Sequence, residues 1–177
     1  MISLFSTLNV TLGVLVIVGQ ITILVLVFGK LFPQKFPKAF QNFFETYGLR
    51  LAFAVALLAF LGPLTYSEIV GLTPCKLCWL QRIAMFPQVF LLGIALWRKE
   101  TLIRFYSIPM VLIGAAISVY HYLMQHAVVP EGDCGVVGQN AHSCGSIFID
   151  VFGYITIPMM ALTAFLLIAL LLGNVRD

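Results

Sequence analysis

Charged side chains are scarce in this chain of 177 residues, of which 10% are Asp, Glu, Lys or Arg and 61% are hydrophobic. Soluble domains carry about 25% charged residues, so the polar coat of a soluble globular protein is missing. The net charge is only +3, and no stripe of basic residues is present that could follow a phosphate backbone. The sequence also lacks the ten-residue alternation of a membrane β-barrel and any internal repeat. These absences exclude nucleic-acid binding and indicate an all-α integral membrane protein.

Long apolar segments are what the chain has instead, and about 20 apolar residues suffice for a helix to cross a bilayer. Lipid cannot satisfy open strand edges, so each segment is expected to be helical. Five membrane spans are predicted, over approximately Val10–Phe28, Leu49–Ile69, Cys78–Trp97, Leu102–Gln125 and Tyr154–Leu172.

The first apolar segment differs from a cleaved signal peptide, which begins with positive charge. Residues 1–29 contain no charged side chain, and the first basic residue is Lys30. We therefore expect an extra N-terminal transmembrane helix (1–29), a basic cytoplasmic linker (30–48) and a four-helix bundle (49–177). We expect the extra helix to be peripheral to that bundle.

The distribution of basic residues predicts the orientation in the membrane, because cytoplasmic loops are enriched in Lys and Arg. The predicted cytoplasmic side carries Lys30, Lys35, Lys38, Arg50, Arg98, Lys99, Arg104 and Arg176. Only Lys76 and Arg82 fall on the opposite side. The pattern predicts an N-terminus outside and a C-terminus in the cytoplasm, with every cysteine at the extracytoplasmic face. Disulfides form and persist there.

The first cysteine pair forms a C-x-x-C motif at the start of the third span. Pro74 precedes Cys75, as expected at a helix entry. A thiol at a helix N-terminus is more acidic than usual, and the thiolate is the reactive form. Arg82 lies on the same helical face as Cys75 and Cys78 and would favour a thiolate or bind an anion. The alternative is an Arg82 that extends to lipid phosphates.

The second cysteine pair, Cys134 and Cys144, lies in a glycine-rich polar loop. A structural clip is one interpretation, and a mobile dithiol carrier is the other. His142 could bias the ionisation of Cys144. A zinc site is disfavoured because nine residues separate this pair and two spans separate it from the C-x-x-C motif. We predict no metal.

Two more polar residues, on the predicted fourth and second spans, are expected near the outer face. His121 could donate a hydrogen bond to a quinone carbonyl, or it could be a buried histidine satisfied by a neighbouring carbonyl. Glu68, near the outer end of the second span, could pair with Arg82 or Lys76.

The segment Pro-Cys-Lys-Leu-Cys-Trp-Leu-Gln-Arg-Ile-Ala-Met-Phe-Pro (74–87) resembles the DsbB/BdbC family of membrane thiol:quinone oxidoreductases. The resemblance extends through Tyr-His-Tyr-Leu-Met-Gln (120–125) to the loop cysteines. It implies that Cys75 and Cys78 form a quinone-coupled disulfide, with Cys78 nearer the quinone and Arg82 at the quinone site. It also implies a shuttle disulfide between Cys134 and Cys144, with Cys134 forming the mixed disulfide, and a quinone-linked His121.

The family resemblance implies an enzyme of a bacterial-type cytoplasmic membrane that reoxidises an extracytoplasmic thioredoxin-fold oxidase of DsbA/BdbD type. Electrons would pass from the loop pair to the C-x-x-C pair and on to the membrane quinone pool, as ubiquinone or menaquinone. The extra first span and the short loop depart from the family pattern. One alternative is a vitamin K epoxide reductase-like quinone reductase, although there the loop cysteines precede the C-x-x-C motif. The other is a non-enzymatic scaffold with structural disulfides.

Overall fold

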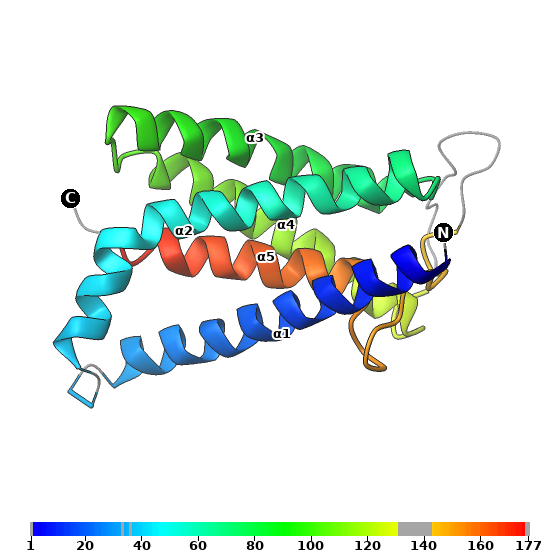
Figure 1. The fold of residues 1–177 in the computed structure, drawn as a ribbon, viewed down its shortest axis with the longest axis horizontal. Coiled ribbons are helices and arrows are strands. Elements are labelled where there is room, and N and C mark those ends of the chain that lie inside the picture. The colour runs from blue at the N-terminus through cyan, green and yellow to red at the C-terminus, as the bar shows by residue number, and fades with distance from the viewer. Residues whose placement is uncertain (1, 33, 36, 131–142, 176–177) are drawn as a thin grey trace.

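The computed structural model describes residues 2–32, 34–35, 37–130 and 143–175, and these are almost entirely helical. An isolated bridge between Val151 and Ile155 precedes the last helix. The helices are α1 (Ile2–Leu31), α2 (Lys38–Leu64), the π-helix η1 (Thr65–Ile69), α3 (Lys76–Arg98), α4 (Arg104–Gln125) and α5 (Ile157–Leu172). They lie roughly side by side, with the start of α1 at the same end as the start of α3 (Figure 1). The all-α prediction is confirmed.

Four of the five predicted spans are long and apolar enough to cross a membrane, namely α1, α2 with η1, α3 and α4. The helices begin and end close to their predicted spans, except that α1 begins at Ile2 rather than near Val10 and α2 begins at Lys38 rather than near Leu49. Much of the expected linker is therefore helical. Pro37 lies at the N-cap of α2, where its missing N–H leaves no hydrogen bond unmade. The fifth segment, α5, is a shorter apolar helix of 16 residues.

Helix α5 occupies the centre of the bundle and packs against α1, α2 and α4 (Figure 1). Its side chains Phe165 and Ile168 are fully buried. A Cβ atom added to Gly114 of α4 would lie 2.3 Å from the Phe165 ring, so the ring occupies space that only glycine leaves. Because α5 is surrounded by protein, its apolar residues form the core of the bundle.

Helix α1 is held against the bundle by polar contacts three turns apart on one face. The Tyr66 hydroxyl donates to Asn9 Oδ1 at 2.7 Å, and the Tyr154 hydroxyl donates to Gln20 Oε1 at 2.9 Å. The Gln20 amide in turn lies 3.4 Å from the Thr163 hydroxyl. At Gly19, an added Cβ would lie 3.1 Å from Thr163 Cγ2, so glycine permits close approach to α5. Helix α1 therefore lies at the edge of the bundle, mainly against α5, and is fastened there by specific contacts.

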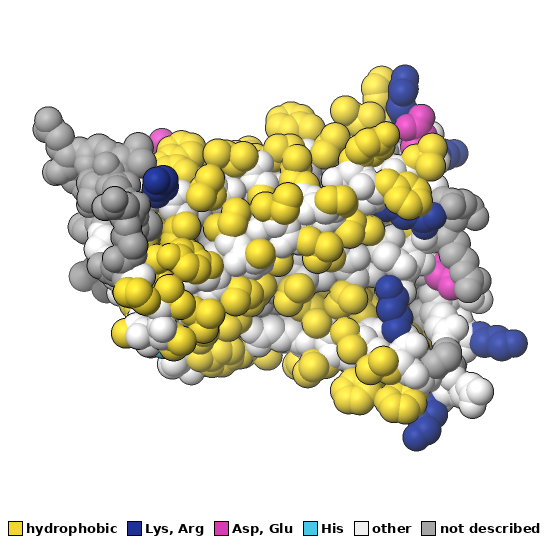
Figure 2. Space-filling view, turned by 180° about the vertical axis from the view of Figure 1, so that it is seen from behind, with side chains coloured by type: hydrophobic (Ala, Val, Ile, Leu, Met, Phe, Trp, Pro, Cys, Tyr) yellow, Lys and Arg dark blue, Asp and Glu magenta, His cyan; other side chains and the backbone are white. Residues whose placement is uncertain are grey.

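Charge is distributed unevenly between the two ends of the molecule. Apolar side chains cover the middle, whereas most Lys and Arg side chains gather at the end away from the α3 N-terminus (Figure 2). Lys76 is the exposed cation at the other end, beside Cys75. The Lys and Arg side chains of the described residues thus gather mainly at one end, as the sequence predicts.

Candidate functional site

Cys75 is the N-cap of α3, and its local geometry follows from the Pro-Cys-Lys-Leu-Cys sequence. Its backbone is extended, with φ −74° and ψ 173°, and its Sγ accepts a hydrogen bond from the Cys78 N–H at 3.4 Å. The two Sγ atoms of Cys75 and Cys78 are 3.1 Å apart, and both cysteines are free thiols. The first sulfur therefore lies at the positive end of the helix dipole, as the sequence predicts. A small movement would join the pair in a disulfide.

The reduced Cys75 thiol has a pKa well below its ordinary range. The main cause is the hydrogen bond with the Cys78 thiol, and hydrogen bonds with His121 and the Cys78 N–H act in the same direction. Burial of Cys75 opposes them by penalising the thiolate. Helix N-terminal cysteines are activated in this way, so reduced Cys75 is prepared to react as a nucleophile.

His121 of α4 connects the two halves of the site. It is 2% exposed, and its Nε2 lies 3.1 Å from the Cys144 carbonyl oxygen and 3.8 Å from Cys75 Sγ. A carbonyl only accepts, so Nε2 must carry the hydrogen. Nδ1 is then an acceptor for the Gln81 amide nitrogen at 3.4 Å. His121 is both satisfied by a backbone carbonyl and directed at a thiol.

Cys144 lies against the first cysteine pair. It is disulfide-bonded and 1% exposed, and it packs with Cys75 and Met124 in one buried cluster that Cys78 adjoins. The predicted partner Cys134 and the predicted modulator His142 lie outside the described residues. The structure therefore brings Cys75, Cys78, Cys144 and His121 together, although Cys144 is far from the C-x-x-C motif in sequence.

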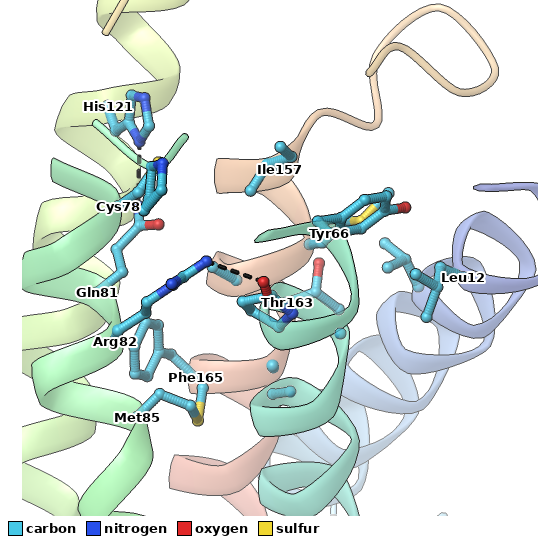
Figure 3. A pocket seen from close by; sticks show the side chains of 18 of the residues that line it. Leu12, Tyr66, Cys78, Gln81, Arg82, Met85, His121, Ile157, Thr163 and Phe165 are labelled. Carbon is cyan, nitrogen blue, oxygen red and sulfur yellow. Dashed lines mark hydrogen bonds between the residues drawn. The ribbon is translucent and has the colours of Figure 1, made fainter. Parts of the chain in front are cut away.

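Arg82 extends from α3 into the space between the helices, below Cys78 and Gln81 and above Met85 (Figure 3). Its Nη2 donates to the Pro63 carbonyl at 2.9 Å, and its guanidinium lies 5.3 Å from the centre of the Trp79 ring. Pro63 lies two residues before the π-helical turn η1, and its carbonyl also accepts a hydrogen bond from the Ser67 hydroxyl in that turn at 3.0 Å. Arg82 thus has a protein partner within the membrane instead of lipid phosphates.

Glu68 does not take the role that the sequence suggested. It is exposed, and it forms no ion pair with Arg82 or Lys76 in the structure. Glu68 lies in η1 and acts on Arg82 only through the attraction of opposite charges, without a direct contact. Arg82 therefore has no ion-pair partner among the described residues.

A cavity of about 350 Å³ opens directly beneath the thiols. Cys75, Cys78, Gln81 and Arg82 form part of its wall, and most of the remaining lining is aliphatic or aromatic. Pockets of this volume and character bind small, largely apolar ligands. A quinone ring fits these properties, since its body is apolar and its two oxygens need a donor or a cation. Tyr66 and Gln81, which also line the cavity, carried no signal in the sequence beyond their polarity within spans.

A metal ion is the other ligand that this cluster could hold. The ligand atoms of Cys75, Cys78 and His121 all lie within 4.8 Å of one another. However, the His121 nitrogen nearest the thiols is the one that must carry a hydrogen for the Cys144 carbonyl, and a protonated nitrogen cannot ligate a metal. The observed hydrogen bonds therefore fit thiol chemistry better than metal binding.

Comparison with known proteins agrees with this geometry. The family model "Disulfide bond formation protein DsbB" matches residues 46–175. Disulfide bond formation protein C of Bacillus subtilis (strain 168) is 46% identical over 120 residues, which cover 68% of this chain and 86% of that protein. Probable disulfide formation protein C 1 of Bacillus anthracis is 42% identical over 125 residues (71% and 88%). A probable disulfide formation protein of Metapseudomonas resinovorans is 37% identical over 130 residues (72% and 88%).

No solved structure is significantly similar to the chain. The family match begins within α2, so α1 lies outside it. Because the match covers most of the chain and includes the C-x-x-C motif and the loop cysteines, the resemblance seen in the sequence is confirmed. The chain belongs to the DsbB family of disulfide bond formation proteins, multi-pass membrane enzymes that act as thiol:quinone oxidoreductases.

Proposed function

We propose that electrons enter at the loop pair Cys134 and Cys144, pass to Cys75 and Cys78, and leave through a quinone held beside Arg82. The observation that carries this proposal is the position of His121, which contacts both Cys75 Sγ and the Cys144 carbonyl. Cys144 of the loop pair therefore lies beside the Cys75 and Cys78 pair at one end of the bundle. A scaffold with structural disulfides would have no need of two free thiols beside a cavity.

The first exchange involves a reduced thioredoxin-fold partner of DsbA/BdbD type. One partner thiolate attacks Cys134 Sγ, so a mixed disulfide forms and Cys144 leaves as a thiolate. The second partner thiolate then attacks the partner sulfur of that mixed disulfide. The partner leaves oxidised, and both loop cysteines are left reduced. Two electrons have entered the chain.

The second exchange moves these electrons inward. The Cys144 thiolate attacks Cys75 Sγ of the Cys75–Cys78 disulfide, which joins Cys144 to Cys75 and releases Cys78 as a thiolate. The Cys134 thiolate then attacks Cys144 Sγ, which restores the loop disulfide and releases Cys75. The low pKa of Cys75 makes it a good leaving group, and the packing of Cys144 beside it shortens the path for attack.

The last exchange restores the Cys75–Cys78 disulfide. Oxidising the two thiols releases two electrons and two protons, which a bound quinone accepts to become a quinol. Cys78 lines the cavity and is the thiol placed to face the quinone. The Arg82 guanidinium, one helical turn deeper, stabilises negative charge that develops on a quinone oxygen.

We place both cysteine pairs at the extracytoplasmic face of a bacterial-type cytoplasmic membrane, with the N-terminus outside and the C-terminus in the cytoplasm. The gathering of Lys and Arg at the opposite end supports this orientation (Figure 2). An oxidising compartment is also where the product disulfides would persist. The electron acceptor is an isoprenoid quinone, ubiquinone or menaquinone. The order of the cysteines along the chain disfavours the vitamin K epoxide reductase-like alternative.

The test uses the full chain in liposomes that contain quinone, supplied with a reduced thioredoxin-fold partner. We expect partner oxidation and quinol formation in equal amounts. A partner variant that keeps only its attacking cysteine should accumulate a reducible adduct with the wild-type chain, and Cys134→Ser should abolish that adduct. Adduct formation that survives Cys134→Ser would refute the proposed entry point. Failure to reduce any quinone would refute the proposed path as a whole.

A further inference from the structure

Helix α1 supplies a wall of the cavity that the family match does not include. Leu12, Val16 and Gly19 of α1 line the same cavity as Cys78 and Arg82, which lie on α3. Leu12 faces the cavity region from α1, with Tyr66 between it and the residues of α3 (Figure 3). The α1 contribution contains no charged side chain. The cavity therefore has a reactive wall and an inert one.

The cavity reaches the outside of the protein between α1 and α2. Three of its lining residues are about half exposed, namely Leu15 (45%), Val18 (54%) and Leu58 (51%). All three lie well inside candidate membrane spans. Side chains exposed at that depth face lipid, so the cavity has a sideways opening into the bilayer.

The hydrogen bonds to Asn9 and Gln20 fix α1 beside this opening. They tie α1 to Tyr66 just before the cavity-lining stretch, which runs from Leu12 to Thr22, and to Tyr154 near the end of that stretch. Tyr66 itself lines the cavity, so the wall and the anchor are in contact. A helix fastened at two points three turns apart keeps the gap at a defined width, as a binding groove requires.

We propose that the gap between α1 and α2 binds the isoprenoid tail of the quinone, with the ring held at Cys78 and Arg82. This inference rests on the proposed function. An isoprenoid chain is a narrow, wholly apolar ligand that must leave the ring site for lipid, and this gap joins the two through apolar side chains. Helix α1 would thus determine tail recognition, while the family-matched helices carry the chemistry.

The experiment compares matched pairs of substitutions on both sides of the gap. Val18→Trp and Leu58→Trp fill it, whereas Val14→Trp and Leu61→Trp place the same side chain on α1 and α2 outside the cavity lining. The control positions are similarly exposed, at 47% for Val14 and 48% for Leu61. Two quantities are measured in nanodiscs: the Kd of a radiolabelled long-tailed quinone, and the KM of a water-soluble quinone without a tail.

We expect the two gap variants to raise the Kd of the long-tailed quinone roughly tenfold, as steric exclusion from an apolar pocket does. Their KM for the tail-less quinone should stay within about twofold of the wild-type value, and both controls should bind like wild type. Equal Kd values in gap and control variants would overturn the inference and leave the electron path intact. If the wild-type chain reduces neither quinone, the proposed function fails and this inference fails with it.

Discussion

Helices α3 and α1 contribute opposite properties to one cavity. Helix α3 supplies sulfur, amide and guanidinium groups from Cys78, Gln81 and Arg82, whereas α1 supplies only small, apolar or hydroxyl side chains. Reactive groups in a membrane need partners: Arg82 donates to the Pro63 carbonyl, and Gln81 is held by His121. The α1 wall needs none and can vary without harm to the chemistry. Chemistry is therefore concentrated on one wall, and the other wall controls shape and access.

The largest expected effect comes from removing the thiol that faces the cavity. Cys78→Ser should abolish quinol formation, because no disulfide can form between positions 75 and 78. The variant should still oxidise one equivalent of reduced partner through its loop disulfide. A single-turnover assay with quantification of both products checks this. If the variant fails to oxidise even this one equivalent of partner, the substitution has unfolded the site, and the result does not test the electron path.

Substituting the guanidinium should have the next largest effect. Arg82→Gln removes a charge-assisted hydrogen bond, worth roughly 1.5–3 kcal/mol, so the KM for quinone should rise about tenfold to a hundredfold. Arg82→Lys should recover part of this loss, because it retains the charge without the planar fork. Steady-state kinetics with varied quinone separates KM from kcat. Unchanged kinetics in both variants would remove Arg82 from the quinone site.

The acidity of Cys75 should depend on its neighbours in a defined order. Its pKa is low because Cys78 and His121 stabilise the thiolate, so removing either should raise the pKa and move the midpoint of alkylation to higher pH. His121→Ala should shift that midpoint by roughly one to two units, the value of one hydrogen bond to a charged group. Cys78→Ser should shift it further, because the Cys78 contact is the largest cause.

Rates of iodoacetamide labelling at Cys75, followed by mass spectrometry across pH, measure these midpoints. The variants should carry Cys134→Ser and Cys144→Ser so that the loop thiols do not react. A larger shift for His121→Ala than for Cys78→Ser would contradict the order given above. A labelling midpoint at lower pH in either variant would contradict the predicted rise in the Cys75 pKa.

The smallest expected effect concerns the fastening of α1. Asn9→Leu removes the acceptor of the Tyr66 hydroxyl, and hydrogen bonds between membrane helices average about 0.6 kcal/mol. The free energy of unfolding in detergent should fall by about that amount. Thr11→Leu is the matched control, since the Thr11 hydroxyl donates only to Thr7 of the same helix. Equal losses in the two variants would show that Asn9 does not anchor α1.

Much of the site could be predicted from the spacing of residues along α3. Cys75, Cys78 and Arg82 share one face because they lie at helical intervals, and Pro74 marks where the helix begins. Asn9 and Gln20 were not recognised as anchors, because a lone amide in an apolar span reveals no partner. The sequence also does not reveal the hydrogen-bond partner of Arg82: Glu68 is only one of the candidates that it offers, and the structure has the Pro63 backbone carbonyl in that place.

The sequence by itself determined the membrane class, the approximate spans and the C-x-x-C chemistry, because these depend on local hydrophobicity and on helical periodicity. Only the tertiary structure decided that Cys144 lies beside Cys75, that His121 contacts both, and that α1 completes the cavity. These relations join segments distant in the chain. They depend on how α5 packs at the centre, where side-chain shapes such as Phe165 against Gly114 fix the positions of the helices around it.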